Sequence, residues 1–151
     1  MNMSDWFDPG AEVPRLADFE GGWSVTRDIR DRLAGTHLRF RGQARFEQGA
    51  GGLRYSEVGE LFLPQGGPLR SQRSFIFREK AAGIDVHFDD GRYFHTVPQT
   101  GVTARHHCDP DIYDVLYDFV SWPDWTTLWT VRGPRKDYEM FTRFSPAALA
   151  G

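Results

Sequence analysis

Hydrophobic and polar residues alternate along almost all of the chain between residues 23 and 144. A period of two is typical of strands that bury one face and expose the other. Short turn sequences separate the alternating segments, and Asp90-Gly91 is the strongest hairpin signal among them. No segment in this range has a helical period long enough for a crossover helix, which argues against a parallel sheet.

A run of antiparallel strands must close or stack to hide its apolar face. The sequence therefore predicts an all-β fold, a single antiparallel up-and-down β-barrel of about ten strands, formed by residues 21–145. Residues 1–20 are expected to form an irregular segment, with one helical turn at 16–19, that packs on one end of the barrel. Its apolar anchors would be Trp6, Phe7 and Phe19. Residues 146–151 are expected to be a flexible tail, and no long helix is predicted.

The turns also predict which side chains share the inner face. A two-residue loop at Asp90-Gly91 defines the register of its hairpin. The pairs expected from this loop and from the next two are Val86 with His95, Phe88 with Tyr93, Val97 with Val102, Cys108 with Asp111, and His106 with Tyr113. The resulting face is apolar except for two histidines and three tyrosines.

Opposite charges are expected on the same inner face. If Leu63 lies opposite Leu69, Arg73 comes opposite Gly59 and diagonal to Glu57. Arg27 also falls on an apolar face, although its placement is less firmly defined. A buried charge without a partner is costly, so each of these side chains must reach an opposite charge, water or a ligand.

These positions define the predicted ligand site. The residues expected to contact a ligand are Glu57, Arg73, Tyr93, His95, His106, Tyr113, Tyr117 and Trp129. Histidine and tyrosine can orient a ligand or transfer protons near neutral pH, but the same groups can also form an internal network that defines the register. Glu57 with Arg73 could anchor a carboxylate or phosphate, or form a structural ion pair. Trp129 could stack on a ligand or pack the barrel end.

Composition limits the classes of partner. The 151 residues carry a net charge of −3, which gives no bulk attraction to nucleic acid or to an anionic membrane. No apolar run approaches the ~20 residues of a membrane span, and the N-terminus lacks a signal-peptide pattern. The single cysteine, Cys108, excludes an intramolecular disulfide. We therefore expect a cytoplasmic protein that neither inserts into membranes nor binds nucleic acid.

Sequence motifs of familiar enzymes and metal sites are absent. The chain has no GxSxG, HExxH, paired-carboxylate or nucleotide-binding fingerprint, so no catalytic residue is assigned. His106 and Cys108 would share one face of a strand while His107 points the other way, which makes a sparse zinc site. Zinc and haem are weak alternatives, and no metal or cofactor is expected.

Gly21-x-Trp23, opening the first strand of an antiparallel barrel, resembles the first signature of the lipocalin and fatty-acid-binding (calycin) superfamily. The resemblance implies that an arginine of the last strand, here Arg143, packs across Trp23. The chain also resembles an uncharacterised bacterial family of lipocalin-like proteins, which implies a fold and no activity. The matching segments are 19–23, 29–31, 88–95 and 133–138. A helical lid, a long C-terminal helix and secretory disulfides are not expected here, and no histidine follows His107, unlike nitrobindin-like haem barrels.

The sequence leads to one principal hypothesis, a barrel that binds a small, mostly apolar molecule carrying a polar or anionic group. An alternative is a small-molecule enzyme that uses the His/Tyr/Glu set in the same cavity. A second alternative is a barrel filled by its own side chains that acts through its surface or as a homodimer. A barrel of about ten strands is usually wide enough to enclose a cavity.

Overall fold

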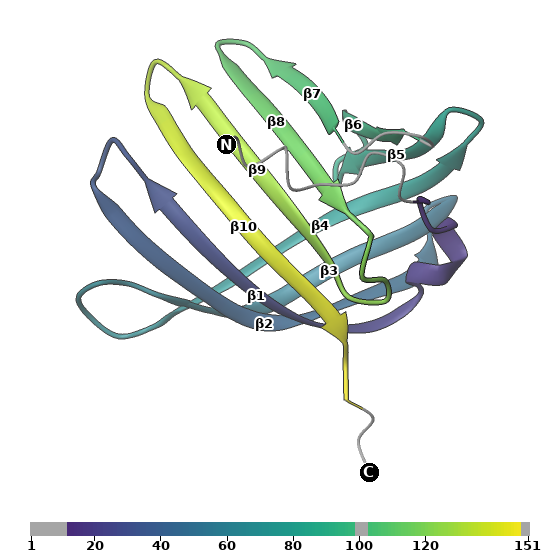
Figure 1. Cartoon of the computed structure of the whole chain (residues 1–151), viewed down its shortest axis with the longest axis horizontal. Helices are drawn as coiled ribbons and strands as arrows, with labels where there is room; N and C mark the ends of the chain where they lie inside the picture. Colours follow the sequence, from purple (N-terminus) through teal and green to yellow (C-terminus); the bar gives the residue numbers. More distant parts are fainter. Residues whose placement is uncertain (1–11, 99–102, 149–151) are drawn as a thin grey trace.

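The computed structural model describes residues 12–98 and 103–148, and they form one ten-stranded antiparallel sheet that curls into a nearly closed barrel (Figure 1). The elements are the 3-10 turn η2 (Leu16–Phe19) and the strands β1 (Gly21–Asp31), β2 (Thr36–Gly49), β3 (Gly52–Phe62), β4 (Leu69–Lys80), β5 (Gly83–Phe88), β6 (Tyr93–Pro98), β7 (Thr103–Cys108), β8 (Asp111–Asp118), β9 (Trp125–Gly133) and β10 (Lys136–Pro146). The predicted all-β barrel of about ten strands is confirmed. No helix in the described part of the chain has the length and apolar character to cross a membrane.

Consecutive strands pair from β1 to β6 and from β7 to β10, and β1 also pairs with β10, so that the sheet order runs β6-β5-β4-β3-β2-β1-β10-β9-β8-β7. Within the described residues, β6 and β7 are therefore the two edges, and no ladder joins them. Side chains bridge this seam instead: the rings of Phe94 on β6 and His106 on β7 lie 5.2 Å apart. The predicted pair of Val97 with Val102 falls partly outside the described residues.

Aromatic side chains fill one end of the barrel. The indole N–H of Trp23 donates to the carbonyl of Phe19 in η2 at 2.8 Å, which holds the turn against the start of β1. The Phe19 ring lies 5.0 Å from Trp122 and 5.5 Å from Phe46. Phe19 is thus buried at the barrel end where the sequence places a helical turn; Trp6 and Phe7 lie outside the described residues.

The register of the β5–β6 hairpin differs from the prediction by one residue. Val86 pairs with His95 as expected, but His87, not Phe88, pairs with Tyr93. The backbone N–H of Phe88 donates to the carbonyl of Arg92 at 2.8 Å, so the loop contains three residues and not two. Gly91 at φ 93° supplies the left-handed position that such a loop requires. A bulge then restores the pairing.

This loop reverses the predicted orientation of one site residue. Tyr93 is 51% exposed on the outer surface, so its predicted inward orientation is wrong. Phe94 and His95, which follow it, are both buried because the bulge breaks the alternation between them. The β7–β8 pairs agree with the prediction: Cys108 lies opposite Asp111 and His106 opposite Tyr113.

Two other expectations are corrected. Leu61, not Leu63, lies opposite Leu69, which brings Arg73 directly opposite Glu57; the shift is even, so both side chains keep their inner face. Arg143 does not pack across Trp23: it lies opposite Thr26, its side chain is 60% exposed, and its guanidinium covers Phe141 at 4.7 Å. Arg143 precedes Pro146, the partner of Trp23, by three positions, and because this offset is odd Arg143 points to the opposite side of the sheet.

Candidate functional site

Three charged side chains from β1, β3 and β4 meet in the middle of the barrel, and we call Arg27, Glu57 and Arg73 the charged layer. Arg27 donates to Glu57 through both terminal nitrogens, NH1 to Oε2 at 2.7 Å and NH2 to Oε1 at 2.9 Å. Its Nε donates to Thr142 Oγ1 on β10 at 2.7 Å. Every nitrogen of the Arg27 guanidinium therefore has a partner, as a buried charge requires.

Glu57 remains ionised because several donors converge on it. Burial alone would raise the pKa of this carboxyl, but the hydrogen bonds from Arg27 and the charges of Arg73 and Arg27 outweigh it and lower the pKa from 4.5 to about 2. The hydroxyl of Tyr55 also donates to Glu57 Oε1. Burial, followed by the negative charge of Glu57, raises the pKa of Tyr55 well above its usual value, so Tyr55 is a neutral donor.

Arg73 differs from Arg27 in how it is held. Its Nε is 3.1 Å from Glu57 Oε2, and its guanidinium lies over the ring of Trp129 at 4.8 Å. No hydrogen bond joins its terminal nitrogens to a described side chain, and the side chain is 26% exposed. Burial, followed by the positive charge of Arg27, lowers the pKa of Arg73. Two arginines thus share one carboxylate, and the charged layer carries an excess of one positive charge.

His95 of β6 and Tyr117 of β8 form a polar pair inside the barrel that is separate from the charged layer. The Nε2 of His95 lies 2.6 Å from the hydroxyl of Tyr117, and both residues are buried. Burial, and then the charge of His106, lower the pKa of His95 from 6.5 to about 3, while burial raises the pKa of Tyr117. A neutral imidazole and a neutral phenol therefore share this hydrogen bond, and the Nδ1 of His95 has no partner among the described residues.

The predicted group of His95, His106 and Tyr113 is not assembled into one hydrogen-bonded set. In the described structure no hydrogen bond joins His106 to Tyr113, although they are cross-strand neighbours with ring centroids 6.2 Å apart. The Tyr113 hydroxyl accepts from Lys136 Nζ at 3.4 Å, and Lys136 also pairs with Asp111 at 3.0 Å. No group of three potential metal ligands occurs in the part of the chain that the structure describes.

The barrel interior is packed on the side of the charged layer that faces η2 and is partly exposed on the other side. The interior cavity between Tyr55, Arg73, His95 and Tyr117 has a volume of about 30 Å³, room for roughly two water molecules. Beyond the charged layer, the inner face is half-buried and its hairpins spread apart (Figure 1). We call this part the open half; its inward residues are Ile29, Leu38, Leu61, Ser71, Tyr113, Trp129, Tyr138 and Met140.

Sequence reasoning identified seven inward residues of this region by strand parity: Glu57, Arg73, His95, His106, Tyr113, Tyr117 and Trp129. It left Arg27 uncertain, and it did not assign Tyr55 or Thr142 a role. The alternation of each strand already predicts that Tyr55 and Thr142 point inward. Their contacts with Glu57 and Arg27, however, depend on how the closed barrel brings these side chains together. Phe94 points inward where Tyr93 was expected to, and the sequence contained no signal for this difference because both residues are aromatic.

Comparison with known proteins reveals a family and a fold. The family of unknown function DUF6314 matches residues 19–146. No curated protein matches the chain. An S-type phycobiliprotein lyase from Guillardia theta has a similar fold: it superposes with a TM-score of 0.62 at 7% identity, over 88% of this chain and 90% of that one. A putative AttH from Nitrosomonas europaea matches at a TM-score of 0.31 and 13% identity, over 94% of this chain and 58% of that one.

Proposed function

Because the chain belongs to the family DUF6314, whose function is unknown, we propose a function from its own site: the barrel binds a small, mostly apolar ligand with an anionic group, and Arg73 anchors that group. The observation that carries this proposal is the excess positive charge of the charged layer. Arg27 is saturated by Glu57 and Thr142, so the excess lies on Arg73. An anionic ligand would neutralise it.

The packing of Arg73 suits this role. Its guanidinium carbon lies over the ring of Trp129, and its terminal N–H groups make no hydrogen bond to a described side chain, so they can donate to a carboxylate. Arg73 is also the partly exposed member of the charged layer, and it lies at the base of the open half. A bound anion at this point would contact the guanidinium without displacing Glu57.

The ligand's apolar part would lie in the open half and not in the interior cavity. The cavity of about 30 Å³ is too small for an acyl chain or a ring system. The inner wall of the open half offers Ile29, Leu38, Leu61 and Met140, all partly exposed. The fold likeness to a phycobiliprotein lyase is compatible with a ligand-handling barrel.

The first test compares an acid with its neutral analogue. Dodecanoate and dodecanol would be titrated into the protein while tryptophan fluorescence is recorded, since Trp129 lies beside the proposed anchor. Arg73→Ala should weaken dodecanoate binding by about 10- to 100-fold, the value of one charge-assisted hydrogen-bonded contact. Dodecanol binding should change by less than about 3-fold.

Arg54→Ala is the matched control, because Arg54 is an exposed arginine on the outer side of β3. It should leave both affinities unchanged. Equal losses for acid and alcohol in Arg73→Ala would remove Arg73 from the anchoring role. A native mass spectrum of the purified protein would show in addition whether an acidic molecule co-purifies with the wild type and is absent from the variant.

A further inference from the structure

The charges of this protein are divided unevenly between two walls of the barrel. Residues 21–80, which form β1 to β4, include eleven arginines and lysines against six acidic residues. Residues 81–135, which form β5 to β9, include four against eight. Because β1 to β4 are consecutive neighbours in the sheet, the excess positive charge lies on one wall, although the whole chain is at −3.

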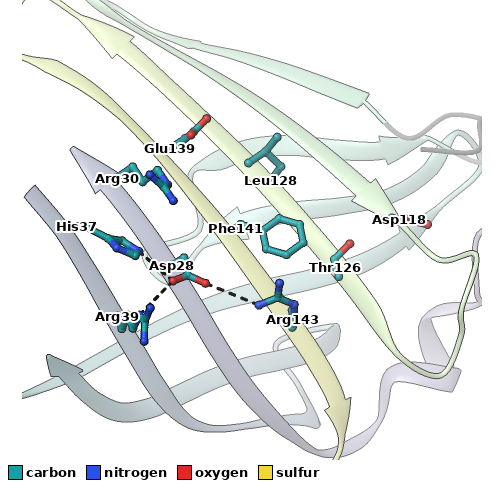
Figure 2. Close-up of a pocket in the computed structure, with 10 residues that line it drawn as sticks. All are labelled: Asp28, Arg30, His37, Arg39, Asp118, Thr126, Leu128, Glu139, Phe141 and Arg143. Atoms are coloured by element: carbon teal, nitrogen blue, oxygen red, sulfur yellow. Dashed lines mark hydrogen bonds and ion pairs between the residues drawn. The ribbon is translucent and has the colours of Figure 1, made fainter. Parts of the chain in front are cut away.

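A groove crosses the outer side of this wall and continues over β10 towards β8 (Figure 2). Its volume is about 640 Å³. An adjoining hollow of about 700 Å³ shares Asp28, Arg39 and Arg143 with it and extends it to Arg41 and Phe62 on the other side. We call the two together the outer groove. Arg27 and Phe40 also line the second hollow, but Arg73, the proposed ligand anchor, lines neither, so the groove is separate from the site of the proposed ligand.

The arginines of the outer groove are only partly neutralised. Asp28 lies at the centre, 3.0 Å from Nε2 of His37, 3.6 Å from Nε of Arg39 and 3.7 Å from NH1 of Arg143 (Figure 2). Both arginine distances exceed those of a hydrogen bond. Among the other arginines that line the groove, Arg27 is paired with Glu57, whereas neither Arg30 nor Arg41 forms an ion pair with a described residue. The groove can therefore accept further carboxylates.

Apolar side chains line the same groove. Leu128 of β9 faces outward but is only 5% exposed, and Phe141 of β10 lies beneath the Arg143 guanidinium. At the opposite end, Phe62 of β3 is 42% exposed. A partner that pairs with the arginines would thus also find apolar surface, which favours a polypeptide with mixed acidic and apolar side chains.

We propose that the outer groove binds an extended acidic segment of a partner protein in which acidic and apolar residues alternate. Arg39 and Arg41 are two residues apart on β2, hence ~7 Å apart, which equals the spacing of alternate side chains in an extended peptide. Nucleic acid fits less well, because the carboxylates of Asp28, Asp118 and Glu139 line the groove and would repel a continuous phosphate backbone.

The test uses the full chain and a fluorescein-labelled decapeptide in which glutamate alternates with leucine, followed by fluorescence anisotropy. The double variant Arg39→Glu/Arg143→Glu should weaken binding at least about 10-fold, since two favourable charge contacts become repulsive. Arg54→Glu/Arg70→Glu is the matched control: it makes the same change in net charge at two arginines of β3 and β4 that lie outside the groove, and it should cost less than about 3-fold. Arg73→Ala should have no effect, so this proposal and the internal ligand are tested independently.

Three results would overturn the proposal. Equal losses in the two double variants would mean that diffuse charge, not the groove, attracts the peptide. Equal or tighter binding of a ten-nucleotide oligothymidylate would identify a polyanion site. A tenfold gain in peptide affinity on Asp5→Asn/Asp8→Asn would show that the chain's own acidic N-terminal residues compete for the groove. Circular dichroism spectra that match the wild type would verify the folding of each variant.

Discussion

Among single residues, Arg27 and Arg73 show how position in the barrel gives two chemically identical side chains different contacts and different exposure. Arg27 is fully buried and donates from all three nitrogens, and its guanidinium also lies over Phe40 at 5.0 Å. Arg73 makes a single contact with Glu57 and is partly exposed. We therefore expect Arg27 to act mainly in stability and Arg73 in binding.

His95 leads to a prediction about pH. Its pKa is about 3 in the folded barrel, lowered by burial and then by the charge of His106, against 6.5 for an unperturbed histidine. Between these values the unfolded chain binds a proton that the folded chain does not, so folding stability falls as the pH is lowered. One such proton corresponds to ~1.4 kcal/mol per pH unit.

The measurement is urea unfolding of the wild type and His95→Gln between pH 7 and pH 4. Below pH 6.5 the wild type should lose about 1.4 kcal/mol per unit more than the variant, which retains a polar partner for Tyr117 but does not titrate. His107→Gln, at an exposed position next to His106, should follow the wild type. Parallel profiles for wild type and His95→Gln would contradict the assigned burial of a neutral imidazole.

At the scale of elements, a glycine pair lets β2 and β3 support the charged layer. Gly42 and Gly59 lie opposite each other, and the ring of Phe40 extends over both. A Cβ on Gly42 would come within 2.7 Å of Cζ of Phe40 and 2.9 Å of the Gly59 Cα. The absence of side chains at this pair therefore allows Phe40 to cover Arg27.

Gly42→Ala should destabilise the protein by about 1–3 kcal/mol, because the strands and the Phe40 ring must move to make room. Thermal or urea unfolding measures this change directly. Gly67→Ala is the matched control, since a Cβ at Gly67 in the β3–β4 loop meets nothing within 4 Å. A Gly42→Ala variant as stable as Gly67→Ala would show that β2 and β3 can separate at this point without cost.

At the scale of the whole molecule, the barrel has a sealed end, an open half and a seam. The aromatic cluster around Phe19 seals one end. At the seam, β6 and β7 are in contact only through side chains such as Phe94 and His106 among the described residues. Strand edges that lack a ladder expose backbone N–H groups to water. The seam is therefore the part of the sheet that should open most easily.

Hydrogen exchange tests this arrangement. The amides of β7 should exchange faster than those of β1 and β10, which lie in the middle of the sheet order and are paired on both sides. Dodecanoate should slow exchange along β4 and β9, which hold Arg73 and Trp129, and leave β7 as before. If β7 were as protected as β1 in the free protein, the barrel would be closed by a ladder in solution.

The strands and the faces of most residues can be predicted from the sequence, because the alternation of side chains is a local property of extended backbone. It therefore placed Glu57, Arg73 and Tyr117 inside the barrel and ten strands in one sheet. A loop one residue longer than its Asp90-Gly91 signal suggested was enough to turn Tyr93 outward.

Which inner residues contact one another depends on the tertiary structure. Arg27 reaches Glu57 and Thr142 from strands 30 and 115 residues away, and the curvature and stagger of the closed sheet bring them into one layer. The same closure determined that the packed half leaves about 30 Å³ and that the open half exposes Arg73. Alternation defines a face, whereas distances across a barrel depend on how all its strands are tilted and joined.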